Sequence, residues 1–169
     1  MPFEHTRFST LISPWELHFN AAHFITYANV CENLHGHNFH VRIDASGSNT
    51  EDGYVIDFVL LNRLAAEICA TLNDQVLLPG LSTVVRVTPM DDRVEVESFG
   101  KRFLLPRENC LLLPVSNTTA ELIAWHISEE LIKRLREAGA LSNIATLEVA
   151  VEEADRQWGT CKRGILNER

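Results

Sequence analysis

The sequence predicts an α+β domain in which an antiparallel β-sheet carries two helices packed on one face. Three observations lead to this class. Segments near both ends of the chain alternate apolar and polar residues, as half-buried strands do. Two longer segments repeat apolar residues at helical spacing, and short strand-like segments lie between them. Strands followed by a helix, a hairpin, a second helix and a last strand are typical of an α+β architecture.

The first half of the chain predicts two strands and a helix. A strand is expected from Trp15 to Ala22, and a second from Phe39 to Ala45, where every other residue is apolar. The residues from His23 to Asn38 then connect these strands. Apolar residues three or four positions apart predict the first helix from Asp57 to Leu72, with Asp57 capping its start.

The second half predicts a meander, a helix and a strand. Thr83–Val87, Arg93–Glu97 and Lys101–Leu105 are short segments of strand-like composition, with turn residues between them. A second helix is expected from about residue 118 to the Ala138-Gly139 pair, and a last strand from Ile144 to Val151. The exposed edges of such a sheet favour self-association, which predicts a homo-oligomer.

Composition sets limits on function. The 169 residues are 46% hydrophobic and 22% charged, which predicts one globular domain spanning residues 1–169 without repeats or linkers. Fifteen basic against 23 acidic residues give a net charge of −8, which argues against a general nucleic-acid binder. The longest apolar runs are far too short to span a membrane, and no signal-peptide pattern begins the chain. We therefore expect a cytoplasmic protein that contacts neither nucleic acid nor membrane.

The four cysteines do not pair in the sequence. They stand at positions 31, 69, 110 and 161, without a C-x-x-C motif, so neither a disulfide framework nor a thiolate zinc knuckle is indicated. Cys69 and Cys110 lie in apolar runs and are expected to be buried. Cys31 and Cys161 lie among polar residues, and their roles stay open from the pattern alone.

Three histidines and one cysteine gather within twenty residues, namely His23, Cys31, His35 and His37. On an extended chain, residues i and i+2 point to the same side, so His35 and His37 can face one ion. His23 supplies a third imidazole. Three neutral imidazoles with one open position are the ligand pattern of catalytic zinc, whereas structural zinc sites usually hold four ligands rich in sulfur. The segment therefore predicts a Zn²⁺ site.

These residues belong to a wider pattern that resembles the family of 6-pyruvoyltetrahydropterin synthases and 6-carboxytetrahydropterin synthases. The resemblance is ordered and covers nearly the whole chain. The motifs that carry it are Phe19-x-Ala-Ala-His23, Cys31-x-x-x-His35-Gly-His37-Asn-Phe39-x-Val41, Gly53-Tyr-Val-Ile-Asp57-Phe58, Asn117-Thr-Thr-Ala-Glu121 and Val149-x-Val151-x-Glu153.

The resemblance implies a tunnelling fold, in which trimers close a β-barrel and pair into hexamers with zinc near the subunit interfaces. It implies a pterin substrate, 7,8-dihydroneopterin triphosphate, and a lyase reaction that eliminates triphosphate. It also implies that the three histidines hold zinc, that Cys31 is the general base and that Glu153 anchors the pterin. The spacing from Cys31 to His35 is more similar to that of bacterial 6-carboxytetrahydropterin synthases of queuosine synthesis than to that of animal 6-pyruvoyl synthases.

The chain departs from the family pattern after the first helix. The family carries an Asp-His pair there to relay protons with the cysteine, and this chain has Asn73-Asp74. Asparagine transfers no proton, while Asp74 could act as a base only with a raised pKa. The alternatives are therefore a synthase in which Asp74 is catalytic, a retro-aldol cleavage of the pterin side chain, or a homologue that binds zinc and a pterin without turnover.

Two further features stay open at the level of sequence. The segment from Ser82 to Pro106 is longer than its counterpart in short family members, and it either reshapes the pocket mouth or decorates the barrel edge. Thr118 and Glu121 have two equally good interpretations. They could form a capping box at the start of the second helix, or they could bind the pterin.

Overall fold

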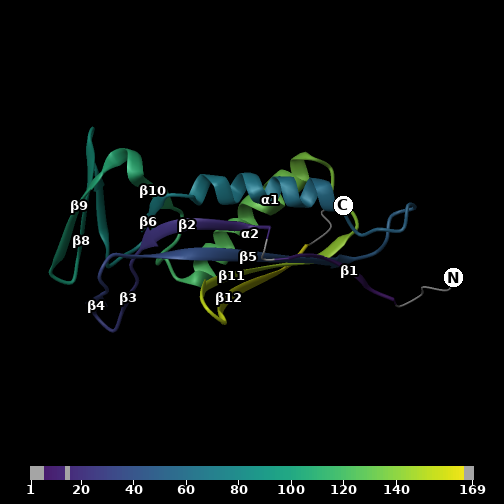
Figure 1. Cartoon of the computed structure of the whole chain (residues 1–169), viewed down its shortest axis with the longest axis horizontal. Helices are drawn as coiled ribbons and strands as arrows, with labels where there is room; N and C mark the ends of the chain where they lie inside the picture. Colours follow the sequence, from purple (N-terminus) through teal and green to yellow (C-terminus); the bar gives the residue numbers. More distant parts are fainter. Residues whose placement is uncertain (1–5, 14–15, 166–169) are drawn as a thin grey trace.

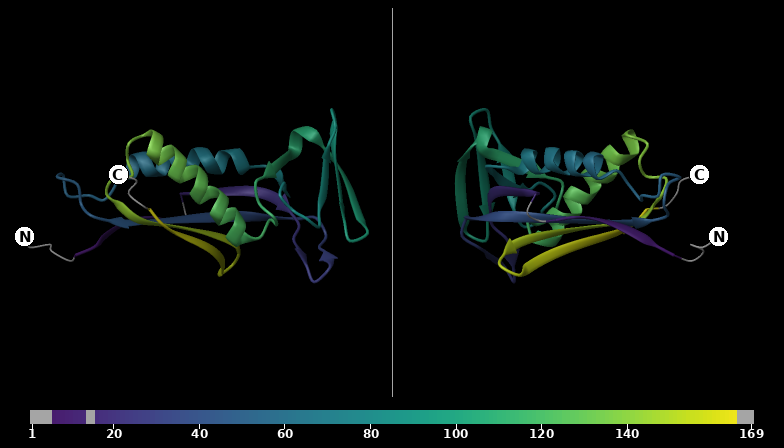
Figure 2. Two further views of the ribbon diagram at one scale, coloured as in Figure 1. Left: turned by 180° about the vertical axis from the view of Figure 1, so that it is seen from behind. Right: turned by 45° about the vertical axis from the view of Figure 1, so that its right-hand side comes forward.

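The computed structural model describes residues 6–13 and 16–165. Within these ranges, seven strands form the main sheet, and two helices lie together on one of its faces (Figures 1 and 2). The helices are α1 (Phe58–Leu72) and α2 (Ala120–Glu137). The strands of the main sheet are β1 (Phe8–Ile12), β2 (His18–His23), β5 (His35–Gly47), β6 (Gln75–Pro79), β10 (Cys110–Leu113), β11 (Ile144–Ala154) and β12 (Gln157–Gly164).

The predicted α+β class is confirmed, with one change to the sheet. The strand order is β10-β6-β2-β5-β11-β12, and β1 also pairs with β5. Pairing among β1, β2, β5, β11 and β12 is antiparallel as expected, but β6 pairs in parallel with both β2 and β10. The sheet is therefore mixed. Trp15, the expected start of the first strand, lies outside the described residues.

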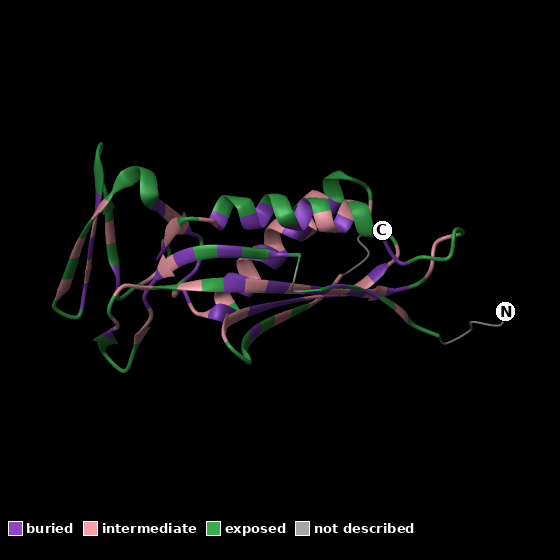
Figure 3. Cartoon of the chain, in the orientation of Figure 1, coloured by how far each residue is buried: buried purple, intermediate pink, exposed green. Residues whose placement is uncertain are grey.

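The core lies between the helices and one sheet face. Phe39, Val41, Ile43 and Ala45 of β5 are fully buried and alternate with partly exposed residues, as the sequence predicts (Figure 3). Helix α1 buries Leu61, Leu64, Ala65, Ile68, Cys69 and Leu72, while its first residue, Phe58, is exposed. Asp57 caps this helix by accepting a hydrogen bond from the Val59 amide at 2.8 Å. No helix in the described part of the chain is long and apolar enough to cross a membrane.

Five smaller elements stand at one end of the sheet (Figure 1). Their bounds are β3 (Thr26–Tyr27), β4 (Val30–Cys31), β7 (Arg86–Pro89), β8 (Arg93–Ser98) and β9 (Lys101–Pro106). The β3–β4 hairpin lies within the expected connection between the first two strands, and β5 begins earlier than predicted. The predicted meander is confirmed, because β7, β8 and β9 form a three-stranded antiparallel sheet. The short 3-10 helix Arg107–Asn109 leads from β9 into β10.

The start of α2 corrects one expectation. Its N-cap is Thr119, whose side chain makes no capping hydrogen bond. The interpretation of Thr118 and Glu121 as a capping box is therefore wrong. Glu121 is exposed in the first turn, where a carboxylate is favoured by the helix dipole. The Thr118 side chain is instead buried and engaged elsewhere.

Strand β12 passes so close to the start of α2 that only glycine fits at position 159. A Cβ there would lie 2.4 Å from the Glu121 amide nitrogen and 2.5 Å from the Ala120 carbonyl carbon. Because backbone atoms cannot move aside cheaply, we expect Gly159→Ala to lower the free energy of unfolding by about 1–3 kcal/mol. Urea unfolding measures this change. Gly164→Ala in the same strand is the control, since a Cβ there meets nothing within 4 Å, and equal stability of the two variants would contradict the prediction.

Candidate metal centre and active site

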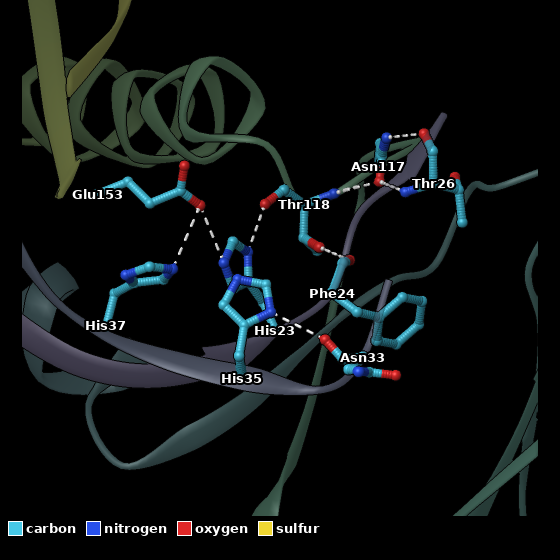
Figure 4. Close-up of polar contacts among 9 residues, drawn as sticks. All are labelled: His23, Phe24, Thr26, Asn33, His35, His37, Asn117, Thr118 and Glu153. Carbon is cyan, nitrogen blue, oxygen red and sulfur yellow. Dashed lines mark hydrogen bonds and ion pairs between the residues drawn. The ribbon is translucent and has the colours of Figure 1, made fainter. Parts of the chain in front are cut away.

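The three predicted histidines meet on the helix-facing side of the sheet. Strands β2 and β5 pair so that His23 stands directly opposite His35, and His37 follows two residues along β5. The ring centroids lie 4.7 Å apart for His23 and His35, 4.9 Å for His35 and His37, and 5.3 Å for His23 and His37. The strand register therefore places His23 beside His35 and His37 in one cluster, shown in Figure 4.

A carboxylate completes this cluster. Glu153 lies two residues beyond the buried Val151 on β11, at a register shift in the β11–β12 ladder, where a bulge can redirect a side chain. Its Oε1 atom is 2.9 Å from His23 Nε2 and 4.0 Å from His37 Nε2. One potential ligand atom from each of His23, His35, His37 and Glu153 lies within 4.8 Å of the others. The four side chains could thus share a metal ion.

Backbone carbonyls orient two of the imidazoles. His23 Nδ1 donates to the Thr118 carbonyl oxygen at 2.8 Å, and His35 Nδ1 donates to the Asn33 carbonyl oxygen at 2.8 Å (Figure 4). When Nδ1 carries the hydrogen, a neutral ring presents the lone pair of Nε2. This is the usual arrangement of a metal-binding histidine, in which an outer hydrogen bond fixes the tautomer and aims the other nitrogen at the ion.

The pair of His23 and Glu153 is incomplete without a cation. Within the described residues, the buried Nε2 atom of His23 makes no hydrogen bond, although Glu153 Oε1 lies 2.9 Å away. A carboxylate and an imidazole lone pair are both acceptors, so they need a shared proton or metal ion. The donor set therefore fits a dication.

Burial affects His37 in a direction that favours metal binding. It lowers the pKa of His37, while the charge of Glu153 acts in the opposite direction. The net shift of the His37 pKa is downward, which favours the neutral ring. Only neutral imidazole can donate a lone pair to a metal, so this environment suits a ligand.

Thr118 and Asn117 hold the site together from the segment before α2. The Thr118 hydroxyl donates to the Phe24 carbonyl at 2.7 Å, while its own carbonyl holds His23. The Asn117 side chain accepts from the Thr26 amide at 3.2 Å and donates to the Thr26 carbonyl at 2.9 Å. The Asn-Thr motif thus fixes both a metal-site histidine and the hairpin after it. The expected contacts of Thr118 and Glu121 with a pterin remain predictions.

Removing the Thr118 hydroxyl should weaken metal binding without removing a ligand. Thr118→Val keeps the shape of the side chain but leaves the Phe24 carbonyl without its donor. Changes in the outer shell of a metal site typically cost about 10–100-fold in affinity, and we expect the lower end because the Thr118 carbonyl remains. Competition with a chelator measures the zinc affinity. Thr119→Val is the matched control, since its hydroxyl makes no capping hydrogen bond; equal losses in both variants would contradict this role.

Cys31 lies in a different environment from the histidines. It is buried in a second apolar cluster with Phe24, Val94 and Val96, and its thiol faces the Glu32 carbonyl at 3.5 Å. Burial raises the pKa of the Cys31 thiol above its ordinary value, against the opposing effects of the Lys101 charge and the Ser98 side chain. The other predictions for cysteine hold, because Cys69 and Cys110 are buried.

Asp74 has none of its described contacts with Cys31. It is exposed, follows α1 with a left-handed backbone (φ 58°), and accepts a hydrogen bond from the Asn73 side chain at 2.8 Å. It lines an open pocket of about 350 Å³ together with His37 and Asn20. The groups that act on the Cys31 pKa are Lys101, Ser98 and Glu32. A catalytic role for Asp74 therefore remains a prediction without a contact to the thiol.

Comparisons with known proteins agree with this geometry. A sequence model described as 6-pyruvoyl tetrahydropterin synthase matches residues 14–164. A protein of Methanocaldococcus jannaschii, provisionally named a 6-carboxy-5,6,7,8-tetrahydropterin synthase, is 32% identical over 151 residues, which are 89% of this chain and 91% of that protein. A similarly named Pyrococcus abyssi protein is 30% identical over 146 residues, 85% of each chain.

Solved structures extend the agreement to three dimensions. The crystal structure of the 6-pyruvoyl tetrahydropterin synthase of Plasmodium vivax has a TM-score of 0.87 and 30% identity, covering 94% of this chain and 99% of that one. Two variants of that enzyme, changed at a glutamate described as a catalytic residue, have the same TM-score and 29% identity over the same shares of each chain. Sequence and fold agree, and the chain belongs to the 6-pyruvoyl tetrahydropterin synthase family.

Proposed function

We propose that this chain is a zinc-dependent lyase that eliminates triphosphate from 7,8-dihydroneopterin triphosphate. The observation that carries the proposal is the cluster of His23, His35 and His37 around the carboxylate of Glu153, in a chain related to pterin synthases. The names of the archaeal relatives favour the 6-carboxytetrahydropterin branch over the 6-pyruvoyl branch. Placement in queuosine synthesis and in the cytoplasm are further predictions.

Zinc would be held by the imidazoles of His23, His35 and His37. When bound, it would act as a Lewis acid toward the side-chain hydroxyls of the pterin and make neighbouring protons more acidic. The protein's part is to keep the three rings neutral and aimed at one point, which the carbonyls of Thr118 and Asn33 do for two of them. Donors of this type suit zinc well.

Cys31 would move the protons. As a thiolate it would take a proton from the substrate side chain, and as a thiol it would return one after the electron pair of the broken C–O bond leaves with triphosphate. This role requires ionisation of a buried thiol, so the groups that oppose the effect of burial on its pKa are central to the reaction.

Glu153 would hold the pterin ring. A carboxylate can accept two parallel hydrogen bonds from the N–H and amino groups of a guanidine-like edge. The Glu153 side chain is 27% exposed, so part of the carboxylate faces open space beside the histidines. Glu153→Gln distinguishes this role from metal ligation, because loss of an anchor weakens pterin binding with zinc retained, whereas loss of a ligand weakens zinc binding first.

A retro-aldol cleavage of the pterin side chain is the second candidate. One observation favours it, the replacement of the family's Asp-His pair by Asn73-Asp74. A glutamate is described as a catalytic residue in the related P. vivax enzyme. In this chain Glu32 follows Cys31 directly, and its charge acts on both Cys31 and His37, so Glu32 is a second candidate for the base in either reaction.

One incubation separates these functions. Zinc-loaded protein is mixed with 7,8-dihydroneopterin triphosphate, and the products are identified by mass. Triphosphate together with acetaldehyde would support the 6-carboxytetrahydropterin branch, and triphosphate with a pyruvoyl product the 6-pyruvoyl branch. Fragments of the glycolaldehyde type would support retro-aldol cleavage. Binding without any product would contradict both reactions and leave a pterin-binding homologue.

We also propose that the chain forms a homo-oligomer, a trimer or hexamer in which sheets close into a barrel. Strands β10 and β12 end the main sheet, and their outer edges are free to pair with another copy within the described structure. Light scattering at micromolar concentration should therefore give a particle several times the 19.1 kDa of one chain. A particle of the size of one chain would contradict closure by self-association.

A further inference from the structure

The β7–β9 meander packs directly against the segment that carries Cys31. Val94 and Val96 of β8 share a buried cluster with Cys31, and the ring of Phe103 on β9 stacks on Phe24 with centroids 5.3 Å apart. The contacts join the segment of uncertain role at residues 82–106 to the residues immediately after His23. The meander therefore forms part of the buried surroundings of Cys31.

The turn between β8 and β9 places two polar side chains beside this buried cluster. Phe99 and Gly100 both have positive φ angles, 44° and 81°, as a tight two-residue hairpin requires. Ser98 and Lys101 therefore form the last pair of the ladder and stand opposite each other. Figure 1 shows this meander and the β3–β4 hairpin at the same end of the molecule.

Lys101 reaches from this turn to the metal-site segment. Its Nζ atom donates to Asn33 Oδ1 at 2.7 Å, and the Asn33 carbonyl accepts from His35 Nδ1 at 2.8 Å. The Lys101 ammonium group is thus connected to the His35 imidazole through Asn33, by one hydrogen bond on each side. Asn33 stands between Cys31 and His35 in sequence, so the contact holds the short segment on which both residues lie.

The charge of Lys101 also acts on the thiol. Burial is the dominant influence on Cys31 and raises its pKa, while Lys101 and the Ser98 hydroxyl lower it and the carboxylate of Glu32 raises it. A thiol surrounded by apolar side chains is inert unless a nearby cation or donor favours the thiolate. Among these neighbours, Lys101 is the cation. Ser98 also comes from the meander, and its hydroxyl donates to the Val84 carbonyl at 2.9 Å.

We propose that Lys101 is a positioning residue that the meander supplies to the active site, where its ammonium stabilises the thiolate of Cys31 and holds the 31–35 segment through Asn33. This inference rests on the proposed function, because it assumes that the Cys31 thiolate takes part in the reaction. The lysine thus comes from the meander and contacts Asn33, two residues after Cys31, so that its charge lies in the segment that carries the thiol.

The test follows the reactivity of Cys31 in Lys101→Met and Lys101→Arg. Metal-free protein is alkylated with iodoacetamide across a pH series, and modification of the Cys31 peptide is measured by mass. We expect Lys101→Met to move the midpoint upward by about one pH unit, which is about tenfold slower alkylation at a fixed pH below it. Lys101→Arg restores the charge and should return most of the shift. Cys161, which is partly exposed, serves as the reference thiol in each sample.

Lys162→Met is the matched control, because Lys162 lies on β12 and pairs with Glu148. It should leave the Cys31 profile unchanged. Identical Cys31 profiles for wild type and Lys101→Met would overturn the proposal, as would an arginine variant no better than the methionine one. Turnover of dihydroneopterin triphosphate is measured separately, with kcat expected to fall more than KM rises in Lys101→Met. If the wild type shows no turnover, the proposed function fails while the alkylation profiles still decide the role of Lys101.

Discussion

Replacing His35 and His37 together with alanine should leave the protein without stoichiometric zinc. Both rings come from one strand and face the same point as His23 and Glu153, so the double variant keeps only two of the four candidate ligand atoms. Zinc sites in proteins hold at least three protein ligands in nearly all cases. Metal content after dialysis, measured by elemental analysis, should fall from about one zinc per chain to near zero.

His40→Ala is the control for this experiment. His40 lies on the same strand, but it points to the opposite sheet face, where its Nδ1 atom is 3.8 Å from Glu152. It should retain zinc at the wild-type level. A double variant that still holds one zinc per chain would show that the metal binds elsewhere, and the proposed function would lose its main support.

Replacing Cys31 with alanine should abolish turnover while zinc stays bound. The thiol is outside the cluster of candidate ligands, so its removal takes a proton-transfer group from the reaction without taking a donor from the metal. Loss of such a group typically costs about 10²–10⁴-fold in rate. Steady-state kinetics with 7,8-dihydroneopterin triphosphate and a zinc assay on the same sample measure both effects.

Cys161→Ala provides the comparison for Cys31. Its thiol lies on β12 near the Ser128 hydroxyl, at 3.6 Å, and has no contact with the candidate site in the described structure. Activity near wild type is expected there. If Cys31→Ala is as active as the wild type, the thiol is not the base in any reaction of this chain, and Glu32 or Asp74 becomes the carboxylate to test next.

Much of the fold could be predicted because local patterns were strong. Helix α1 has a capping aspartate and a clear helical repeat, and the central part of β5 alternates residue by residue. Strands β6 and β10 were missed because short continuous apolar runs, such as Cys110–Leu113, do not reveal whether they are strands or with which strand they pair. Strand β12 was missed because it is mostly polar and its pairing with β11 lies outside any local signal.

The same distinction applies to the site. The side chains of His35 and His37 could be predicted to lie on the same side of the sheet, because residues i and i+2 of a strand always do. The exact pairing of His23 with His35 depends on sheet register, which no local pattern gives. Asn117 and Thr118 could be recognised only as helix-start residues, because their actual partners, Thr26 and Phe24, lie more than 90 positions away. The contact of Lys101 with Asn33 joins residues 68 positions apart and likewise has no local signal.

The contacts of Asn117 and Thr118 have a thermodynamic consequence. Asn117 pairs with the Thr26 backbone as a neighbouring strand would, and Thr118 in the same segment orients His23. Metal binding, the order of the β3–β4 hairpin and the docking of the start of α2 are therefore coupled equilibria. Coupling free energies of this kind are reciprocal. Occupancy of the metal site should lower the equilibrium population of the open hairpin that ends at Cys31, and anything that stabilises the closed hairpin should raise the affinity for the metal by the same factor.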